Sequence, residues 1–374
     1  MSGVDFLVKL LDGSGVEWQP LEQIAKIKHG KDWKGLNSGD IPVYGSGGIM
    51  GYVDEYSYNK PTVLIPRKGS ITNIFYVETP FWNVDTIYYT DIDVSKVIPK
   101  YLYHFVKTID LMSLDTGSGR PSLTQAILNK ILVPIPCQEN PEKSLEIQGE
   151  IVRILDAFTV LTAELTAELT ARKKQYHYYR DQLLSFEEGD VVWKTLGDLV
   201  DINTGSKPPE ILEIATSFDY INAGTSRSGY SAASNCVGDT VTTPSRGQGG
   251  IGYVGYQRES FWLGPLCYKL QSIDKTVLIN KYLFYFLQSR SELLLGLKKE
   301  GGVPAVNKSD LVKLEMPVPL LEVQQRIVAI LDKFDALTNS ITEGLPREIE
   351  LRQRQYAYYR DLLLNFPKPE EVEA

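Results

Sequence analysis

Apolar side chains recur at steps of four and three residues along the segment that begins near residue 147. They are Ile151, Ile154, Phe158, Leu161, Leu165, Tyr176, Tyr179 and Leu183. This spacing places one apolar stripe along a helix and is typical of a coiled-coil seam. At 1.5 Å per residue, a helix of about 40 residues is roughly 60 Å long. The pattern therefore predicts a long helix that needs a partner to cover its stripe.

A second segment near the end of the chain shows the same pattern. Its apolar positions are Val323, Ile327, Ile330, Phe334, Leu337, Ile341, Ile349, Tyr356, Tyr359 and Leu363. Gly344 and Pro346 interrupt this segment, and both residue types favour a kink or a break in a helix. Because neither helix can bury its stripe alone, we expect the two to pack together in an antiparallel, coiled-coil-like pair.

The segments that precede the two helices follow a different pattern. Short strand-like runs at 62–65, 71–77 and 86–89 are separated by Gly, Asn and Pro, and helical stretches follow near 99–114 and 280–298. Each segment therefore predicts a globular domain of mixed helix and sheet, and the whole chain an α+β fold. We expect a first domain at 1–139, a long helix at 140–189, a second domain at 190–320, and a second long helix with a tail at 321–374.

The two halves of the chain are copies of one sequence. Residues 175–186 read QYHYYRDQLLSF and return at 355–366 as QYAYYRDLLLNF, and other anchors return in the same order. In contrast, 26–60 and 201–240 share little beyond scattered glycines. One frame that carries two divergent inserts predicts a pseudo-twofold molecule whose halves present different surfaces. A duplication without functional symmetry is the alternative.

Composition and charge narrow the class of protein. The hydrophobic and charged fractions, 43% and 23%, are ordinary globular values. Three widely spaced cysteines without metal-ligand spacing, and no apolar run near the ~20 residues of a membrane span, predict a cytoplasmic protein. The net charge of -8 is unusual for a protein that binds nucleic acid. However, the globular segments are nearly neutral, with 13 basic and 15 acidic residues in the first and 13 of each in the second.

The sequence contains no recognisable catalytic motif. It lacks GxxxxGK[ST], a GxGxxG that opens a helix, GxSxG, HExxH and the Asn/Asp-Pro-Pro-aromatic motif of adenine aminomethyltransferases. The histidines His29, His104 and His177 are isolated along the chain, which favours structural or surface roles. The glycine-rich stretches 45–48 and 247–250 predict tight turns rather than phosphate sites. We therefore expect no catalytic residue, metal or cofactor in this chain.

Polar side chains suited to base edges or phosphates lie among glycines and aromatics in both globular segments. Arg and Lys suit phosphate or guanine O6 and N7, and Gln and Asn suit adenine N6 and N7. Arg67 or Lys68, and Arg246, recur at the same place in both halves, whereas a solvated surface role is the alternative for the others. The candidates are Lys31, Lys34, Ser46, Arg67, Lys68, Arg120, Gln125, Lys207, Asn222, Arg227, Arg246, Gln248 and Lys308.

These features together resemble one known family. The two divergent domains each precede a repeated helix, the QYxYYRD motif occurs at 175 and 355, and a tandem TAELTAEL occupies 162–169. In these respects the whole chain looks like the specificity subunit of a Type I restriction-modification system, particularly of the Type IC branch.

The resemblance implies a non-catalytic DNA-binding subunit with two target-recognition domains, one for each half of a bipartite target. Its helices would set the distance between the domains and dock two methyltransferase subunits, which bring S-adenosylmethionine for adenine methylation. Two motor-nuclease subunits, which use ATP and Mg, would join them for restriction. The QYxYYRD residues are near-identical in halves whose DNA targets should differ, which favours helix pairing or partner docking over DNA reading. They are Tyr176, Tyr179, Arg180, Asp181, Tyr356, Tyr359, Arg360 and Asp361.

The tandem repeat also predicts a mechanism for spacing. Thr162, Leu165, Thr166 and Leu169 mark two TAEL units whose residues all tolerate helical geometry. Gain or loss of a unit would change the helix length by four residues without changing either domain. An ordinary amphipathic helix with a repeat of no consequence is the alternative.

Two other classes of protein remain as alternatives from the sequence. One is an enzyme that fuses specificity and methylation in one chain, although the cofactor and catalytic motifs are missing. The other is a repeat scaffold or adhesin whose two domains bind protein or glycan ligands. Binding of S-adenosylmethionine by the isolated chain would favour the first, and failure to associate with an adenine methyltransferase would favour the second.

Overall fold

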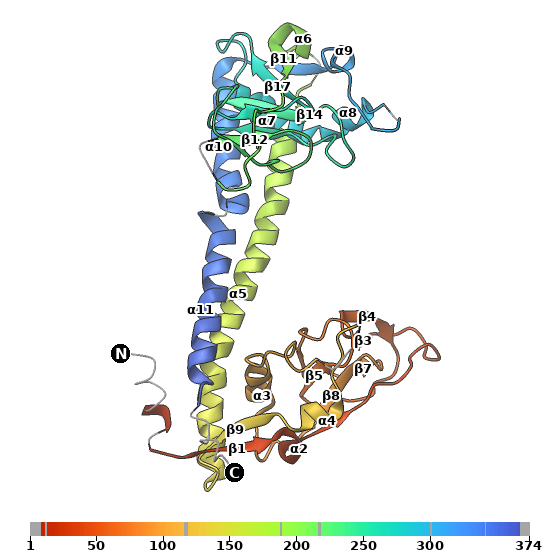
Figure 1. Ribbon diagram of the computed structural model, residues 1–374, viewed down its shortest axis with the longest axis vertical. Helices are drawn as coiled ribbons and strands as arrows, with labels where there is room; N and C mark the ends of the chain where they lie inside the picture. Colours follow the sequence, from red (N-terminus) through yellow and green to blue (C-terminus); the bar gives the residue numbers. More distant parts are fainter. Residues whose placement is uncertain are drawn as a thin grey trace. The chain divides into compact units, whose positions relative to one another are not determined.

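Two units make up the chain in the computed structural model shown in Figure 1. The structure describes residues 9–11, 13–115, 119–187, 189–215, 218–299, 301–340 and 342–366. Unit 1 comprises residues 1–165 and 348–374, and unit 2 comprises residues 166–347. Each unit therefore combines one globular domain with parts of the long helices.

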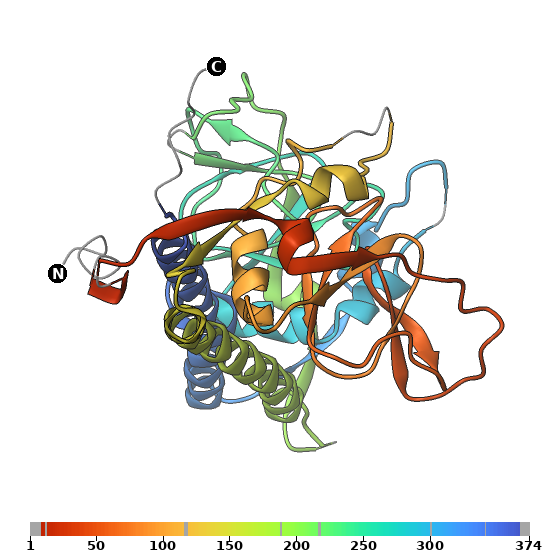
Figure 2. The same ribbon diagram turned by 90° about the horizontal axis from the view of Figure 1, so that it is seen from below.

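Unit 1 contains three small sheets in its described residues. The strand β1 pairs antiparallel with β9, and the two lie beside the first turns of the long helix α5 (Pro141–Leu183) (Figure 2). A four-stranded sheet has the order β2-β8-β5-β6, and a three-stranded sheet has the order β4-β3-β7. The elements of this domain are β1 (Val16–Pro20), α2 (Leu21–Ile24), β2 (Ala25–Lys28), β3 (Ile41–Gly45), β4 (Gly48–Val53), β5 (Thr62–Pro66), β6 (Phe75–Val77), β7 (Trp82–Asn83), β8 (Ile87–Ile92), α3 (Pro99–Val106), α4 (Gln125–Asn129) and β9 (Leu132–Pro136).

Unit 2 repeats this topology strand for strand. β10 pairs with β18, the four-stranded sheet has the order β11-β17-β14-β15, and the three-stranded sheet has the order β13-β12-β16. The elements are β10 (Val192–Thr195), α6 (Leu196–Leu199), β11 (Val200–Thr204), β12 (Phe218–Ile221), β13 (Tyr230–Ser231), β14 (Thr240–Pro244), β15 (Gly255–Gln257), β16 (Trp262–Leu263), β17 (Cys267–Ser272), α7 (Asn280–Ser289), α8 (Ser291–Gly296), α9 (Lys308–Leu311) and β18 (Glu315–Val318). The α+β class and the internal repeat expected from the sequence are confirmed.

Local sequence explains where the expected elements end. The run 62–65 becomes β5, which is buried at every position. The strand expected at 71–77 forms only at its end, as β6, because Gly69 has a φ of +83° and turns occupy the residues up to Asn73. The helix expected near 99–114 stops at Val106, and the one near 280–298 divides at Arg290 into α7 and α8.

The long helices differ in continuity. α5 (Pro141–Leu183) runs for 43 residues without interruption. The second helix is divided into α10 (Leu321–Asn339) and α11 (Gly344–Leu363). Gly344 has a φ of +78°, which side chains rarely adopt, and this explains why the helix breaks where the sequence places Gly344 and Pro346.

Two antiparallel helix segments pack on the core of each unit. In unit 1 the early part of α5 and the end of α11 join one core, through Ile151 and Leu155 and through Leu363 and Phe366. Since one segment leaves this core and the other arrives at it, they run in opposite directions. In unit 2 the end of α5 and the early part of α10 meet in the same way. The expected antiparallel pairing is thus present within each unit.

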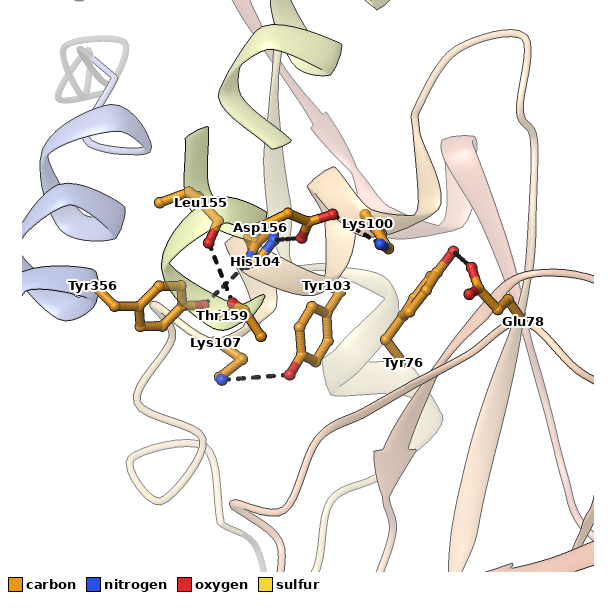
Figure 3. Close-up of polar contacts among 10 residues, drawn as sticks. All are labelled: Tyr76, Glu78, Lys100, Tyr103, His104, Lys107, Leu155, Asp156, Thr159 and Tyr356. Carbon is orange, nitrogen blue, oxygen red and sulfur yellow. Dashed lines mark hydrogen bonds and ion pairs between the residues drawn. The ribbon is translucent and has the colours of Figure 1, made fainter. Parts of the chain in front are cut away.

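A polar cluster fixes the domain of unit 1 to its helix pair (Figure 3). His104 on α3 is 1% exposed; its Nε2 lies 3.0 Å from Asp156 Oδ1 on α5, and its Nδ1 lies 2.9 Å from the Tyr356 hydroxyl on α11. Lys100, one turn earlier on the same face of α3, pairs with the other Asp156 oxygen at 2.8 Å. Lys107 lies over the Tyr356 ring at 5.2 Å.

Unit 2 has polar contacts between its domain and its helices at the equivalent positions, and we call each such set of contacts a joint. Tyr285 replaces His104 and donates its hydroxyl proton to Asp332 on α10. Lys281 lies 3.5 Å from the same carboxylate, and Tyr176 on α5 donates to Gln288 at 3.2 Å. The two joints therefore share their geometry, but only that of unit 1 contains a histidine.

We predict that the histidine joint makes the stability of unit 1 sensitive to mild acid. Burial lowers the pKa of His104 below its usual 6.5, against the opposing effect of Asp156. The unfolded chain therefore takes up the proton first, so that the stability is complete above about pH 6.5 and is lost as the pH falls below it. His104→Gln should show a shallower decline of Tm between pH 6.5 and 5 than the wild type. The exposed His177→Gln is the control and should keep the wild-type slope; parallel curves for all three proteins would contradict the prediction.

Candidate nucleic-acid interface

Two adjacent loops carry most of the candidates of unit 1. The backbone N–H of Gly69 donates to the Pro121 carbonyl at 3.0 Å, and Leu123 N–H donates to the Arg67 carbonyl at 2.9 Å. Lys68 forms an isolated β-bridge with Ser122. The loops are thereby joined, and they place four candidates on one stretch of surface. These are Arg67, Lys68, Arg120 and Gln125.

Ser46 lies on the turn between β3 and β4, next to these loops. Asn73 Nδ2 donates to its carbonyl at 3.2 Å, and its own N–H donates to Thr86 Oγ1 at 3.3 Å. Lys31 and Lys34 are exposed on the separate stretch after β2. The structure thus brings five of the seven unit 1 candidates together and places the two lysines on another loop.

The same joined loops recur in unit 2. Gly247 N–H donates to the Pro304 carbonyl at 3.1 Å, and Arg246 forms a β-bridge with Ala305. Arg246 is therefore the structural equivalent of Lys68, not of Arg67. Lys308, the first residue of α9, takes the place of Gln125, the first residue of α4.

The other unit 2 candidates lie in three places. Asn222 and Arg227 line a hollow of about 360 Å³. Asn222 Oδ1 accepts from Leu266 N–H at 2.9 Å, and Arg227 pairs with Asp219 at 3.1 Å. Gln248 lines another hollow, of about 370 Å³, and Lys207 is exposed on the loop after β11. The candidates of unit 2 are therefore more scattered than those of unit 1.

The first tyrosine of each QYxYYRD motif is part of the joint between domain and helices. Tyr176 is 4% exposed, and Tyr356 contacts His104. Burial raises the pKa of the Tyr176 hydroxyl to about 12, so it stays protonated and available as a donor. Tyr179 stacks on Phe334 at 5.9 Å.

The remaining motif residues repeat the same contacts. Tyr359 stacks on Phe158 with ring centroids 5.2 Å apart. Arg180 pairs with Asp181 at 2.8 Å and lies 5.9 Å from the Tyr176 ring. Arg360 pairs with Asp361 at 2.6 Å and lies equally far from the Tyr356 ring. Thr162, Leu165, Thr166 and Leu169 lie in the uninterrupted middle of α5.

The middle tyrosine of each motif was not singled out by the sequence analysis. Tyr178 and Tyr358 are each 62% exposed. The helical register turns Tyr178 away from the core of unit 2, which holds Tyr176, and Tyr358 away from the core of unit 1, against which Tyr356 packs. The two halves thus expose the same aromatic side chain to the same degree at the same place of the motif. Tyr178 and Tyr358 occupy the same position of the repeated motif, and this repetition was the signal by which the sequence could have pointed to them.

The chemistry of the described residues adds little to these surfaces. Burial raises the pKa of the Cys267 thiol to about 12, so this thiol is protonated at neutral pH. Within the described ranges, no group of three His, Cys, Asp or Glu side chains is placed to hold a metal ion. A search of the same ranges for a helix long and apolar enough to cross a bilayer also finds none.

Comparison with known proteins places this arrangement in a family. The family model for the Type I restriction modification DNA specificity domain matches residues 14–172 and again 188–351. The chain belongs to this family. A Type I restriction enzyme specificity subunit of Escherichia coli is 40% identical over the full length of both chains. A putative specificity subunit of Haemophilus influenzae is 34% identical and covers 96% of this chain and 98% of its own.

A solved structure shows the same fold. The Type I restriction-modification S subunit from M. genitalium has a TM-score of 0.68 and 17% identity, and the match covers 96% of this chain and 98% of that one. The family model and the two relatives confirm the resemblance to a Type I specificity subunit that was stated from the sequence; the chain is not one of the catalytic subunits. The alternatives of a fused enzyme and of an adhesin are not supported.

Proposed function

We propose that this specificity subunit reads a bipartite DNA target, with one half-site for each globular domain. The observation that carries the proposal is the pair of joined loops, which share one backbone arrangement and differ in side chains. Lys68 with Gln125 stands in unit 1 where Arg246 with Lys308 stands in unit 2. Two frames of the same shape with different hydrogen-bonding groups are suited to two different base sequences.

The subunit also acts as a scaffold in this proposal. DNA methyltransferase and restriction subunits assemble on it, two of each, and bring S-adenosylmethionine, ATP and Mg. Much of the phosphate charge is then neutralised by the methyltransferases, which fits a chain of net charge -8. The complex works in the cytoplasm, where its DNA is.

The first test exchanges one domain. Replacement of residues 26–136 with the corresponding segment of another specificity subunit should change one half-site of the methylated target and leave the other unchanged. The reason is that, among the residues that the structure describes, the loops at 67–70 and 119–125 form backbone hydrogen bonds and bridges with each other and with their own domain. Methylome sequencing of cells that carry the partner subunits measures the outcome. The reciprocal exchange of 201–319 should change the other half-site; a change in both halves from either exchange would contradict the proposal.

The second prediction concerns docking of the methyltransferase. Tyr178→Ala together with Tyr358→Ala should weaken its association roughly 30-fold or more, since truncation of an interface aromatic at a hot spot costs about 2 kcal/mol or more. Because both side chains are 62% exposed, the Tm of the subunit should hardly change. Titration calorimetry with purified methyltransferase measures the affinity. Val160→Ala, at an apolar position of α5 that is 56% exposed, is the control; wild-type affinity in the tyrosine variant would exclude docking through these residues.

The third prediction concerns the spacing of the half-sites. Insertion of a third Thr-Ala-Glu-Leu after Leu169 lengthens α5 by about 6 Å and rotates the remainder of the helix by about 40°. With a rise of roughly 3.4 Å per base pair, the non-specific spacer should grow by one or two base pairs. Both half-sites should stay the same, as read by methylome sequencing.

Two control insertions separate helix length from sequence. Four other helix-forming residues, Ala-Glu-Ala-Lys, should lengthen the spacer equally, whereas Gly-Pro-Gly-Pro should abolish methylation because it breaks the helix. An active complex with an unchanged spacer would contradict the mechanism.

A further inference from the structure

A polar pair connects the first residue of a short helix to the end of a strand in each unit. In unit 1, Gln125 Nε2 donates to the Ile27 carbonyl at 3.2 Å, and Gln125 Oε1 lies 3.2 Å from His29 Nε2. In unit 2, Lys308 Nζ donates to Asn203 Oδ1, also at 3.2 Å. His29 thus has a specific partner, although it is isolated in the sequence.

The two pairs occupy equivalent places in the repeated frame. Gln125 and Lys308 each begin a helix three residues after the bridge residue that joins the loops, Ser122 or Ala305. His29 directly follows β2, and Asn203 lies near the end of the equivalent strand β11, one position earlier in the alignment of the repeats. His29, Asn203 and Lys308 are exposed, and Gln125 is half-buried. The positions of the two pairs in the fold are therefore preserved, whereas the polar groups that they expose differ.

Hydrogen bonding fixes the character of the unit 1 pair. Because the amide N–H of Gln125 donates to the Ile27 carbonyl, the amide oxygen faces His29 and can only accept a hydrogen bond from that ring. In the neutral imidazole the proton is then on Nε2, which leaves Nδ1 as an acceptor. The ring meets Tyr88 edge-on at 4.9 Å, which holds its orientation.

The unit 2 pair has the opposite character. The Lys308 ammonium group has three donors and no acceptor, and Asn203 Oδ1 receives one of them. Two N–H donors of the Lys308 ammonium group therefore remain for a ligand, and the bond to Asn203 restrains their position. A side chain fixed in this way loses less conformational entropy on binding than an unrestrained lysine.

We propose that these pairs read bases, each with its own preference, as an extension of the proposed function. His29 Nδ1 accepts a hydrogen bond from the exocyclic amino group of adenine or cytosine in the major groove. Lys308 donates to guanine N7 and O6, the acceptor pair that lysine and arginine read there. The pairs thus contribute to the difference between the half-sites. Asn203 and Gln125 are positioning residues that hold the reading groups.

The test of Lys308 uses the full chain assembled with its methyltransferase and duplexes that carry the target. Lys308→Ala should weaken binding to the target roughly 5- to 150-fold and remove discrimination at one guanine of the unit 2 half-site. Replacement of that guanine by 7-deazaguanine, which lacks N7, should weaken the wild type but not the variant. Lys313→Ala, an exposed lysine on the same segment, is the matched control and should behave as wild type.

The test of His29 follows the same design on the other half-site. His29→Ala should relax discrimination at one base of the unit 1 half-site only, and His29→Gln, which keeps an acceptor, should retain part of it. Analogues of adenine or cytosine without the exocyclic amino group, introduced one position at a time, identify which base is read. They should weaken the wild type and leave His29→Ala unaffected.

Other outcomes would overturn the proposal. An equal loss of affinity for all sequences, with the salt dependence reduced by about one ion, would make Lys308 a phosphate contact. A lowered Tm with unchanged discrimination between bases would mean that both pairs only stabilise the contact between helix and strand. If instead the wild-type complex showed no preference for a bipartite target, the proposed function itself would fail, before any variant is compared.

Discussion

A buried glutamine at the start of each long helix sets the relation between that helix and its domain. Gln148 is 0% exposed; its oxygen accepts from Ile98 N–H at 2.9 Å, and its nitrogen donates to the Lys96 carbonyl at 3.0 Å. Gln324 makes the matching pair of bonds, with Ile279 N–H at 2.9 Å and the Val277 carbonyl at 2.8 Å. A buried amide is stable only when both its groups are bonded, so each glutamine allows one placement of the loop before α3 or α7.

The rest of each unit depends on that placement. With the loop fixed, α3 presents Lys100, His104 and Lys107 at steps of four and three toward the helix pair, and α7 presents its equivalents in the same way. Each of these helices also packs on the four-stranded sheet, in which β5 and β14 lead into the loops that carry Lys68 and Arg246. The recognition loops are thus held at a defined orientation to the helices by a few buried polar contacts, whatever side chains they display.

Periodic features were predictable from the sequence, whereas contacts between distant residues were not. The apolar stripe at Ile151 to Leu183 and the interruption at Gly344 predicted the helices and their break, because period and breaker act locally. The contact between His104 and Tyr356 joins residues 252 positions apart, and neither carries a local signal for it. The strand expected at 71–77 was too long because the turn that Gly69 begins outweighs the β propensity of Ile71.

The candidate site was predictable in its residue types but not in its grouping. The repeat pointed to Arg67 or Lys68 and to Arg246, and the structure places Lys68 and Arg246 in the same kind of bridge. It could not choose between Arg67 and Lys68, since that choice depends on strand pairing. His29 was interpreted as a structural or surface residue because it is isolated along the chain, and its partner Gln125 lies 96 residues away.

The composition of unit 1 has a consequence for synthesis of the protein on the ribosome. Its core includes Leu363, Leu364 and Phe366, whereas unit 2 is a continuous stretch that ends at residue 347. Domains usually fold in the order in which they are translated. Here the domain that is synthesised first lacks part of its core until the last turns of α11 have left the ribosome. The second domain is therefore complete earlier, and the core of the nascent first domain stays incomplete until the end of the chain has been synthesised.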